Sequence, residues 1–312
     1  MRIRTNTSAP SVARLLSKGY DAVVLAYGAM KGQKMGIPGE DAPQVLDVLT
    51  FLREAILGAP PSVGKSVAVI GGGSSAMDGA RMARRLGAGE VTVIYRRTRA
   101  EMPAAPEEVE EALAEDVRME FLAAPTEIAQ NGGRLSVKCI RMTLGAVDES
   151  GRPRPVPLEG SEFTLDVDSV IMAIGQSVES SAAPGYEVDR RGRVRADKRT
   201  LQTSRPGVFA AGDVVTGPAT VIEAIAAGRR AAISVDQYLG GSGDIEEVLA
   251  PAEEAEIAAL EEQEERARAE IGKRPASERV GDFQDVELTM TEQAALAEAG
   301  RCLRCDLEAL ED

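Results

Sequence analysis

Short apolar runs alternate with glycine-rich turns and amphipathic stretches along the chain. Residues 67–70 and 91–94 are apolar without a break, as expected for strands covered on both faces of a parallel sheet. Between them lie three glycines and a stretch, 75–86, in which small and apolar residues recur with helical spacing. This order of strand, glycine turn, helix and strand predicts a βαβ unit.

The segments around this unit extend the same architecture. Helical spacing predicts helices at residues 11–18, 45–56 and 107–116. Ala59-Pro60-Pro61 reads as a linker, so we expect the chain to cross between domains there. Alternating apolar and polar residues within 119–170 predict an antiparallel meander added to the parallel sheet.

An internal repeat indicates two domains of one architecture. Residues 20–28 align with residues 167–175, with Asp, Val, Ala and Gly at equivalent positions, and the two copies end at Gly28 and Gly175. A single copy would fit any buried strand that ends in glycine. Two aligned copies favour a duplicated unit.

Composition and charge narrow the classes of function. A net charge of -14 over 312 residues would repel nucleic-acid phosphates and anionic membranes, so neither is expected as a partner. The first ten residues lack an apolar core, no later run nears the ~20 apolar residues of a membrane span, and three cysteines form no regular framework. We therefore expect a cytoplasmic protein. Because the chain has no histidine, its catalysis must rely on a cofactor or on carboxylates, lysines or thiols.

The turn that opens the helix of the βαβ unit fits the dinucleotide-binding pattern G-x-G-x-x-A. Its residues are Gly71, Gly72, Gly73, Ser74, Ser75 and Ala76. Glycines let the backbone approach a pyrophosphate, and the helix N-terminus offers it free N–H groups and a partial positive charge. The alternative is a purely structural glycine turn.

The next strand ends in Tyr95-Arg96-Arg97, where an NAD-binding domain would carry Asp or Glu for the ribose hydroxyl. A carboxylate would repel a 2′-phosphate, whereas guanidinium groups bind it with paired hydrogen bonds. Arg96 and Arg97 therefore favour NADP(H) over NAD(H), although both cofactors stay open. The alternative is a pair of solvated surface arginines.

Two longer motifs resemble a known family. Residues 203–213, which end in Gly212-Asp213, look like the closing FAD motif of flavoenzymes with two dinucleotide-binding domains. Residues 71–78, together with the run from Tyr95 to Pro103, are similar to the small subunit of glutamate synthase and its relatives. The resemblance extends over nearly the whole chain.

This resemblance implies a set of cofactor sites. It implies that NAD(P)H binds at residues 71–76 and at the two arginines, that Asp213 contacts the flavin ribityl chain, and that the helix beginning near Thr220 and Val221 points its N-terminus at the isoalloxazine. Such a helix end would stabilise the negative charge of reduced flavin. Gly28, Gly175 and Gly212, at the ends of strands, complete the expected cofactor contacts.

The sequence also departs from the family. Tyr27 stands where the family's first flavin-side strand usually has threonine, and no Cys-x-x-Cys adjoins the nucleotide domain, which disfavours a disulfide reductase. Residues 1–7 look like a strand from the middle of the flavin domain, so its opening glycine motif and the preceding iron–sulfur domain are expected to be missing. Cys302 and Cys305 are candidate ligands of a [4Fe-4S] cluster shared with other cysteines, or a free thiol pair.

We predict an α/β fold of paired Rossmann-like domains with a helical C-terminal extension. The expected divisions are a partial FAD domain (1–58), an inserted NAD(P)H domain (59–178), the closing part of the FAD domain (179–240) and a charged segment (241–312). That last segment should hold a polar helix at 253–271 and an amphipathic helix at 291–300.

Function follows from the same resemblance. The leading hypothesis is an oxidoreductase subunit that passes electrons from NADPH through FAD to an iron–sulfur partner or a large catalytic subunit. The alternative is a truncated or split nucleotide-binding module that lacks stable flavin and is not catalytic by itself.

Overall fold

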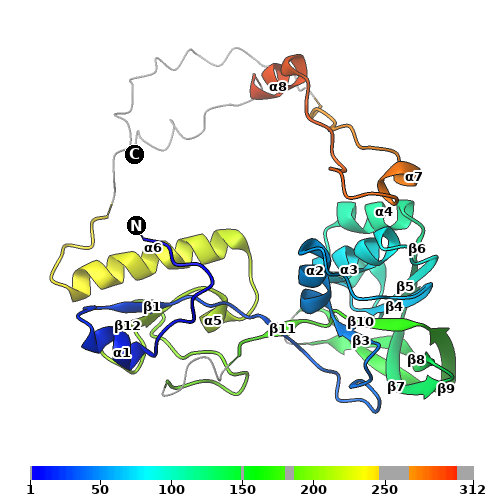
Figure 1. Ribbon diagram of the computed structural model, residues 1–312, viewed down its shortest axis with the longest axis horizontal. Coiled ribbons are helices and arrows are strands. Elements are labelled where there is room, and N and C mark those ends of the chain that lie inside the picture. The colour runs from blue at the N-terminus through cyan, green and yellow to red at the C-terminus, as the bar shows by residue number, and fades with distance from the viewer. Residues whose placement is uncertain (1, 149–150, 180–185, 246–266, 301–312) are drawn as a thin grey trace. The chain divides into compact units, whose positions relative to one another are not determined.

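The computed structural model describes residues 2–148, 151–179, 186–245 and 267–300. The chain divides into two compact units, Met1–Glu246 and Glu247–Asp312. The first unit contains two α/β parts, one around a five-stranded sheet and one around a two-stranded sheet (Figure 1).

The larger sheet is fully parallel. Its strands, in spatial order, are β3 (Val45–Asp47), β10 (Ser169–Met172), β4 (Ser66–Ile70), β5 (Glu90–Tyr95) and β6 (Val117–Phe121). Three helices accompany it: α2 (Val48–Ile56), α3 (Ser74–Arg85) and α4 (Pro106–Ala114). The unit β4–α3–β5 is the βαβ unit that the hydrophobic pattern predicts.

A second sheet covers the other face of the first. It is antiparallel, with the order β7 (Ala123–Asn131), β8 (Arg134–Val147) and β9 (Pro153–Val167). The meander is thus a separate layer. The antiparallel meander predicted within 119–170 is therefore present, and its strands pair with one another while β6 and β10 on either side of it join the parallel sheet.

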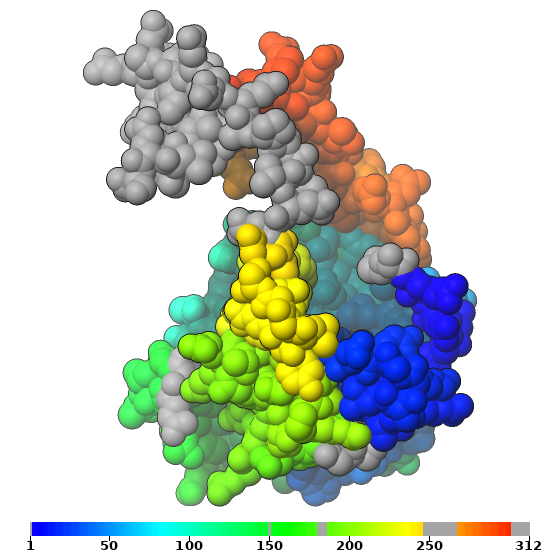
Figure 2. Space-filling model, turned by 90° about the vertical axis from the view of Figure 1, so that its left-hand side faces the viewer, coloured from blue at the N-terminus to red at the C-terminus, as the bar shows by residue number. Residues whose placement is uncertain are grey.

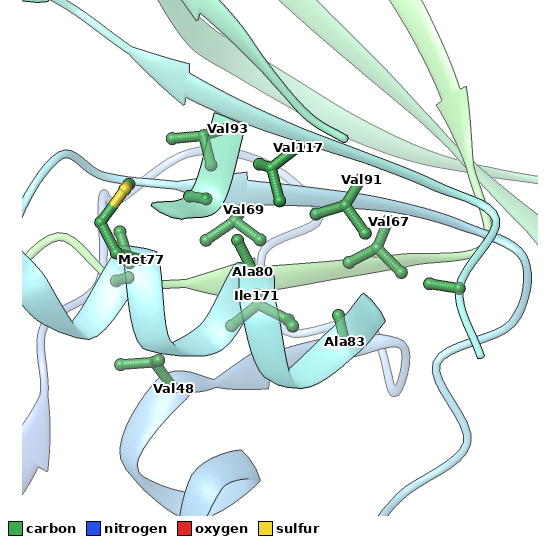
Figure 3. Packing of buried hydrophobic residues seen from close by; sticks show 14 of the residues in the cluster. Val48, Val67, Val69, Met77, Ala80, Ala83, Val91, Val93, Val117 and Ile171 are labelled. Carbon is green, nitrogen blue, oxygen red and sulfur yellow. The ribbon is translucent and has the colours of Figure 1, made fainter. Parts of the chain in front are cut away.

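Alternate residues of β4 explain this layering. Val67 and Val69 pack with Met77 and Ala80 of α3 (Figure 3), whereas Ile70, on the opposite face of β4, packs in a cluster with residues of β7 and β8. All five side chains are almost fully buried. Burial of a valine contributes roughly 1.5–3 kcal/mol, so the uninterrupted apolar run of β4 stabilises both layers.

The helix predicted at 45–56 is partly wrong. Residues 45–47 form β3, which pairs in parallel with β10, and the helix begins only at Val48. Asp47 ends the strand and caps the helix, since its Oδ1 accepts a hydrogen bond from the Thr50 N–H at 3.0 Å. The strand and the first turn are both apolar, so helical spacing alone could not separate them.

The smaller sheet joins the two ends of the first unit. β1 (Val23–Leu25) pairs in parallel with β12 (Val208–Ala210), which lies far away in sequence. The accompanying helices are α1 (Val12–Ser17), α5 (Asp213–Thr216) and α6 (Val221–Tyr238). β2 (Lys31–Gly32) and β11 (Gln176–Ser177) form an antiparallel pair where the chain enters and leaves the larger part.

The two repeated segments both contain a parallel strand. β1 lies within the first copy and β10 within the second, and Gly28 and Gly175 have φ angles of 76° and 124°. The divisions expected at residues 58, 178 and 240 stay predictions. Residues 2–7 lie outside all helices and strands, so the predicted strand is wrong there, and Asn6, with φ 49°, interrupts an extended conformation.

The second unit is described from residue 267 to residue 300. It contains α7 (Ala276–Arg279) and α8 (Glu292–Ala299), and Lys273 forms an antiparallel bridge with Glu287. α8 corresponds to the helix predicted at 291–300. The predicted helix 253–271 is wrong for residues 267–271, which are not helical, and its remainder lies outside the described residues. Across the described ranges, no helix has the length and apolarity to cross a lipid bilayer.

Candidate functional site

A cleft of about 720 Å³ opens where the strands of the larger sheet end. Ile70 ends β4, Tyr95 ends β5 and Ala173 follows β10, and all three line the cleft. Because the three strands are parallel, their carboxyl ends share one edge of the sheet, and this is the edge where α/β proteins bind ligands.

Two glycines in the floor of the cleft are required by close packing. Gly71 has a φ of 144°, its N–H donates to the Ile94 carbonyl at 3.1 Å, and a Cβ there would lie 2.2 Å from the Ala173 carbonyl oxygen. A Cβ on Gly72 would lie 2.5 Å from the ring of Tyr95. The glycines thus bring the loop onto the strand ends, as the sequence motif predicts.

The N-terminus of α3 faces the same cleft. Gly73 is the N-cap, where a Cβ would meet nothing within 4 Å, and Ser74 and Ser75, the first helical residues, line the cleft. Among the described residues no acceptor is found for the N–H groups of Ser74 and Ser75. These donors and the helix dipole suit an anionic group such as a pyrophosphate. Ala76 is fully buried and does not line the cleft.

Arg96 and Arg97 follow β5 but differ in environment. Arg96 is exposed, lines the cleft and has no ion pair with any residue that the structure describes. Arg97 is 3% exposed, and its guanidinium donates to the Pro153 carbonyl and to Asp148 Oδ2, both at 2.7 Å. Of these two arginines, Arg96 is therefore the one whose charge no described acidic side chain compensates.

The stretch after the arginines is a tight connection that holds the cleft wall. The Tyr95 hydroxyl donates to the Glu101 carbonyl at 2.6 Å, and Thr98 and Glu101 form a capping box around the short helix η1 (Arg99–Glu101). Ala104 then donates to the Gly72 carbonyl at 3.1 Å. The Tyr-Arg-Arg to Met-Pro motif therefore fixes the glycine loop to the end of β5.

The residues expected to bind flavin follow the strands of the smaller sheet or lie at the start of α5 and α6. Leu25 pairs with Ala210, so Gly28 and Gly212, which follow these strands, lie at one sheet edge, and Gly212 has a φ of 74°. Asp213 opens α5, and Thr220 is the N-cap of α6 with Val221 as its first residue. Gly175 lines the cleft, but these five residues do not.

The first turn of α6 is exposed on the surface. The Thr220 hydroxyl accepts a hydrogen bond from the Glu223 N–H at 3.2 Å, and the Glu223 carboxylate accepts one from the Thr220 N–H at 2.9 Å. Val221 and Ile222 are 75% and 74% exposed, and Figure 2 shows α6, in yellow, on the surface of the molecule. Pro218, in the preceding turn, lines the cleft, so this turn adjoins the larger site.

Comparison with known families agrees with this geometry. Residues 8–228 match the pyridine nucleotide-disulphide oxidoreductase family. The chain belongs to this family. Membership agrees with the predicted class of NAD(P)H-dependent oxidoreductases, in which FAD and NAD(P)H are the expected cofactors.

Several known proteins are similar to this chain over long stretches of sequence. The chain is 46% identical over 303 residues to the NADP(+)-dependent formate dehydrogenase subunit beta of Moorella thermoacetica, covering 93% of this chain and 43% of that protein. It is 39% identical over 243 residues to the glutamate synthase [NADPH] small chain of Escherichia coli, covering 72% and 52%. The predicted resemblance to glutamate synthase small subunits is confirmed, and the chain spans about half the length of these relatives.

Solved structures give the same fold. FprA of Mycobacterium tuberculosis in complex with NADPH superposes with a TM-score of 0.59 at 21% identity, covering 73% of this chain and 65% of that one. At that identity the likeness concerns the fold. The predicted α/β fold class is confirmed for this pyridine nucleotide-disulphide oxidoreductase family member.

Several lining residues of the cleft carried no signal in the sequence. Gln33 and Lys34, after β2, and Arg152, before β9, line it. Gln33 donates its backbone N–H to the Gly175 carbonyl at 3.0 Å and its side-chain amide to the Gln176 carbonyl at 2.8 Å. These residues belong to no motif, and the pairing of β2 with β11 and the connection between β8 and β9 bring them to the cleft.

The structure does not bear on the proposed cluster ligands. Cys302 and Cys305 lie outside the described residues. Within residues 2–148, 151–179, 186–245 and 267–300, no group of three or more His, Cys, Asp or Glu side chains is arranged to hold a metal ion. Cys139 in β8 is fully buried, and burial raises the pKa of its thiol to about 12, which suits a structural role.

Proposed function

We propose that this family member is an oxidoreductase subunit that takes electrons from NADPH and passes them through FAD to an iron–sulfur partner or a large catalytic subunit. The observation that carries the proposal is the convergence of the Gly71–Gly72 turn, the N-terminus of α3 and Arg96 on one cleft. A pyrophosphate and a 2′-phosphate are the two anions of NADPH, and both find complementary groups there.

The chain's own residues would orient the dinucleotide. The free N–H groups of Ser74 and Ser75 suit the pyrophosphate, and Arg96 suits the adenosine ribose. The nicotinamide end would then lie toward Gly175 and Pro218, on the side of the cleft next to the smaller sheet. The bound nicotinamide and flavin supply hydride-transfer chemistry, while the protein supplies position and electrostatic field.

The names of relatives support electron transfer to a partner. Formate dehydrogenase subunit beta and glutamate synthase small chain are both named as parts of larger enzymes that use NADP(H). We propose the same kind of assembly here, with a partner that receives electrons through iron–sulfur groups. A cluster bound in part by Cys302 and Cys305 remains part of this proposal, and NADH remains the alternative donor.

A second function is favoured by the surface around α6. The flavin-side sheet has two strands in the described residues, and Val221, Ile222 and Ile225 are 65–75% exposed. These features fit a module that binds a nucleotide but does not hold flavin by itself. In that case the flavin would be held jointly with another polypeptide segment.

Binding measurements test the leading proposal. NADPH and NADH are titrated into the purified chain and into Arg96→Glu, with Arg195→Glu, at an exposed position away from the cleft, as the control. A charge-assisted hydrogen bond contributes about 1.5–3 kcal/mol, so Arg96→Glu should weaken NADPH binding about tenfold or more and change NADH binding little. Equal affinities of the unmodified chain for the two cofactors would rule out the NADPH assignment.

The two proposed functions differ in whether the purified protein carries flavin that NADPH can reduce. A yellow protein that NADPH bleaches under anaerobic conditions supports the electron-transfer subunit. A colourless protein that still binds NADPH supports the nucleotide-binding module.

A further inference from the structure

We propose that the exposed basic segment, residues 189–199, is a docking surface for the electron acceptor, and that this acceptor is a small iron–sulfur protein with an acidic face. The inference rests on the proposed function and names the chemistry of the partner. Six of these eleven residues are arginine or lysine and two are aspartate, in a chain whose net charge is -14. The basic segment therefore concentrates positive charge on a protein that is acidic as a whole.

Most of the positive charge of the basic segment is available to a partner. Five of its basic residues are exposed, and the side chains of these five form no ion pair with any residue that the structure describes: Arg190, Arg191, Arg195, Lys198 and Arg199. Exposed charges of one sign on a small area attract a complementary surface and raise the rate at which it associates.

The two aspartates of the basic segment shape its turns. Asp189 Oδ1 accepts hydrogen bonds from the backbone N–H groups of Arg191 and Arg193 at 2.8 and 3.0 Å. Asp197 Oδ1 accepts one from the Thr200 N–H at 2.7 Å. Both carboxylates thus bind the backbone of their own turns, and the basic side chains dominate what each turn presents to a partner.

The first of these turns is attached to the part of the chain that is expected to bind flavin. The Arg193 Nε donates to Asp189 Oδ2 at 2.7 Å, and its Nη1 donates to the Thr216 carbonyl at 2.8 Å. Thr216 is the last residue of α5, the helix that begins at Asp213. A partner bound at Arg190 and the residues beside it would therefore lie next to the flavin side of the molecule, where electrons would leave.

An acidic protein surface fits the basic segment better than a nucleic acid does. The phosphates of a nucleic acid continue beyond any short segment, so they would meet the negative charge of the rest of the chain. The carboxylates of a folded partner can be confined to one face, and the guanidiniums of Arg190 and Arg191 offer them paired donors. Electron-transfer complexes also have small, transient interfaces, which suits a segment of this length.

The test measures binding, so its result does not depend on bound flavin. A fluorescently labelled [2Fe–2S] ferredoxin with an acidic surface is titrated with the full chain, and anisotropy reports the complex. Ionic strength is set at about 0.1 M, where exposed charges act over about 10 Å, and then at about 1 M, where they act over about 3 Å. The unmodified chain should bind at the lower ionic strength and about tenfold or more weakly at the higher one.

Two charge-matched variants locate the docking surface. Arg190→Glu combined with Arg191→Glu should weaken ferredoxin binding about tenfold or more at the lower ionic strength, because like charges then face each other. Arg14→Glu combined with Lys18→Glu makes the same change in net charge at exposed positions in and beside α1, and it should change the affinity less than about twofold. Circular dichroism checks that both variants are folded.

The outcomes separate this inference from the proposed function. A chain that binds NADPH but does not bind the ferredoxin keeps the NADPH site and overturns the docking surface, and so do equal losses in the two variants. Tighter binding of a labelled DNA duplex than of the ferredoxin overturns the class of partner. Ferredoxin binding that depends on Arg190 and Arg191, in a chain that binds no NADPH, supports the docking surface and overturns the proposed electron donor.

Discussion

Replacement of Glu115 by glutamine should weaken the packing of α3 against α4 without altering the cleft. The Glu115 side chain is fully buried at the end of α4, and its two oxygens accept hydrogen bonds from Arg81 and Arg85 of α3 at 2.7–3.1 Å. Arg84 also donates to the Glu115 backbone carbonyl at 3.0 Å. One carboxylate thus compensates two guanidiniums that are 17% and 9% exposed.

The size of the loss of folding stability follows from the ion pairs that remain in Glu115→Gln. Glutamine keeps the shape of the side chain but leaves Arg85 without its buried counter-charge, whereas Arg81 retains an ion pair with Glu111 at 2.8 Å. Loss of one partner of a buried ion pair costs about 3–5 kcal/mol, and we expect about 3 kcal/mol because Arg81 stays paired. A loss of this size should lower the midpoint of thermal unfolding by about 6–12 °C in a unit of this length.

The difference in stability between the unmodified chain and Glu115→Gln should depend on pH. Burial raises the pKa of Glu115, but hydrogen bonds from Arg85 and Arg81 outweigh it and hold the pKa below the ordinary glutamate value. A carboxyl group with a lowered folded-state pKa contributes stability above its unfolded pKa of roughly 4.3, and that contribution is lost as the pH falls through the folded-state pKa. The unmodified chain and Glu115→Gln should therefore differ most near neutral pH and converge in acid.

The assay is thermal unfolding followed by circular dichroism at neutral pH and in acid. Glu110→Gln is the control, because Glu110 lies on the same helix, is 64% exposed and pairs with exposed Arg99. A surface pair of this kind contributes about 0–1 kcal/mol. NADPH affinity below the transition should be the same in both variants. Equal midpoints for Glu115→Gln and Glu110→Gln would refute the reasoning.

Three further predictions concern the cleft, the buried thiol and the flavin side. Gly72→Ala should weaken NADPH binding at least tenfold, because its Cβ would lie 2.5 Å from the Tyr95 ring, whereas Gly89→Ala, with its Cβ 3.7 Å from the nearest atom, should bind normally. Cys139 should resist iodoacetamide at pH 8 in the folded chain and react after unfolding, because burial raises the pKa of its thiol to about 12. Peptide mass spectrometry measures the labelling of both states, and rapid labelling of the folded chain would contradict the burial of Cys139. The purified chain should hold FAD at well below one equivalent, because the smaller sheet has only two strands in the described residues, and NADPH should bleach the fraction that is bound. Absorbance at 450 nm that indicates stoichiometric FAD would show that the smaller sheet and α6 suffice.

The nucleotide-binding part could be predicted in detail because its physics is local. The G-x-G-x-x-A turn, the apolar run of β4 and the small residues of α3 follow one another in the sequence. The steric demands on Gly71 and Gly72 and the exposed helix N-terminus result from contacts within this short segment and its neighbouring strand. The sequence motif therefore predicts the turn and the helix of this part as the structure has them.

The roles of the arginines could not be predicted in the same way. Arg96 and Arg97 are equivalent in the sequence, and only the distant β8–β9 turn, with Asp148 and Pro153, separates them. Arg152 reaches the cleft through the same turn and lies in no motif. The failure at residues 45–47 has a related cause, since pairing with β10, far along the chain, makes them a strand.

The pairing of β2 with β11 bears on how the chain folds. β1 and β12 lie at opposite ends of the first unit, so joining them directly would close a very long loop, and the entropic cost of closure grows with loop length. Once the nucleotide-binding part has formed, β2 and β11 hold its entry and exit together, and the effective loop between β1 and β12 shrinks to residues 26–30 and 178–207. We therefore expect the inserted part to acquire its structure first during synthesis, with the outer strands joining last.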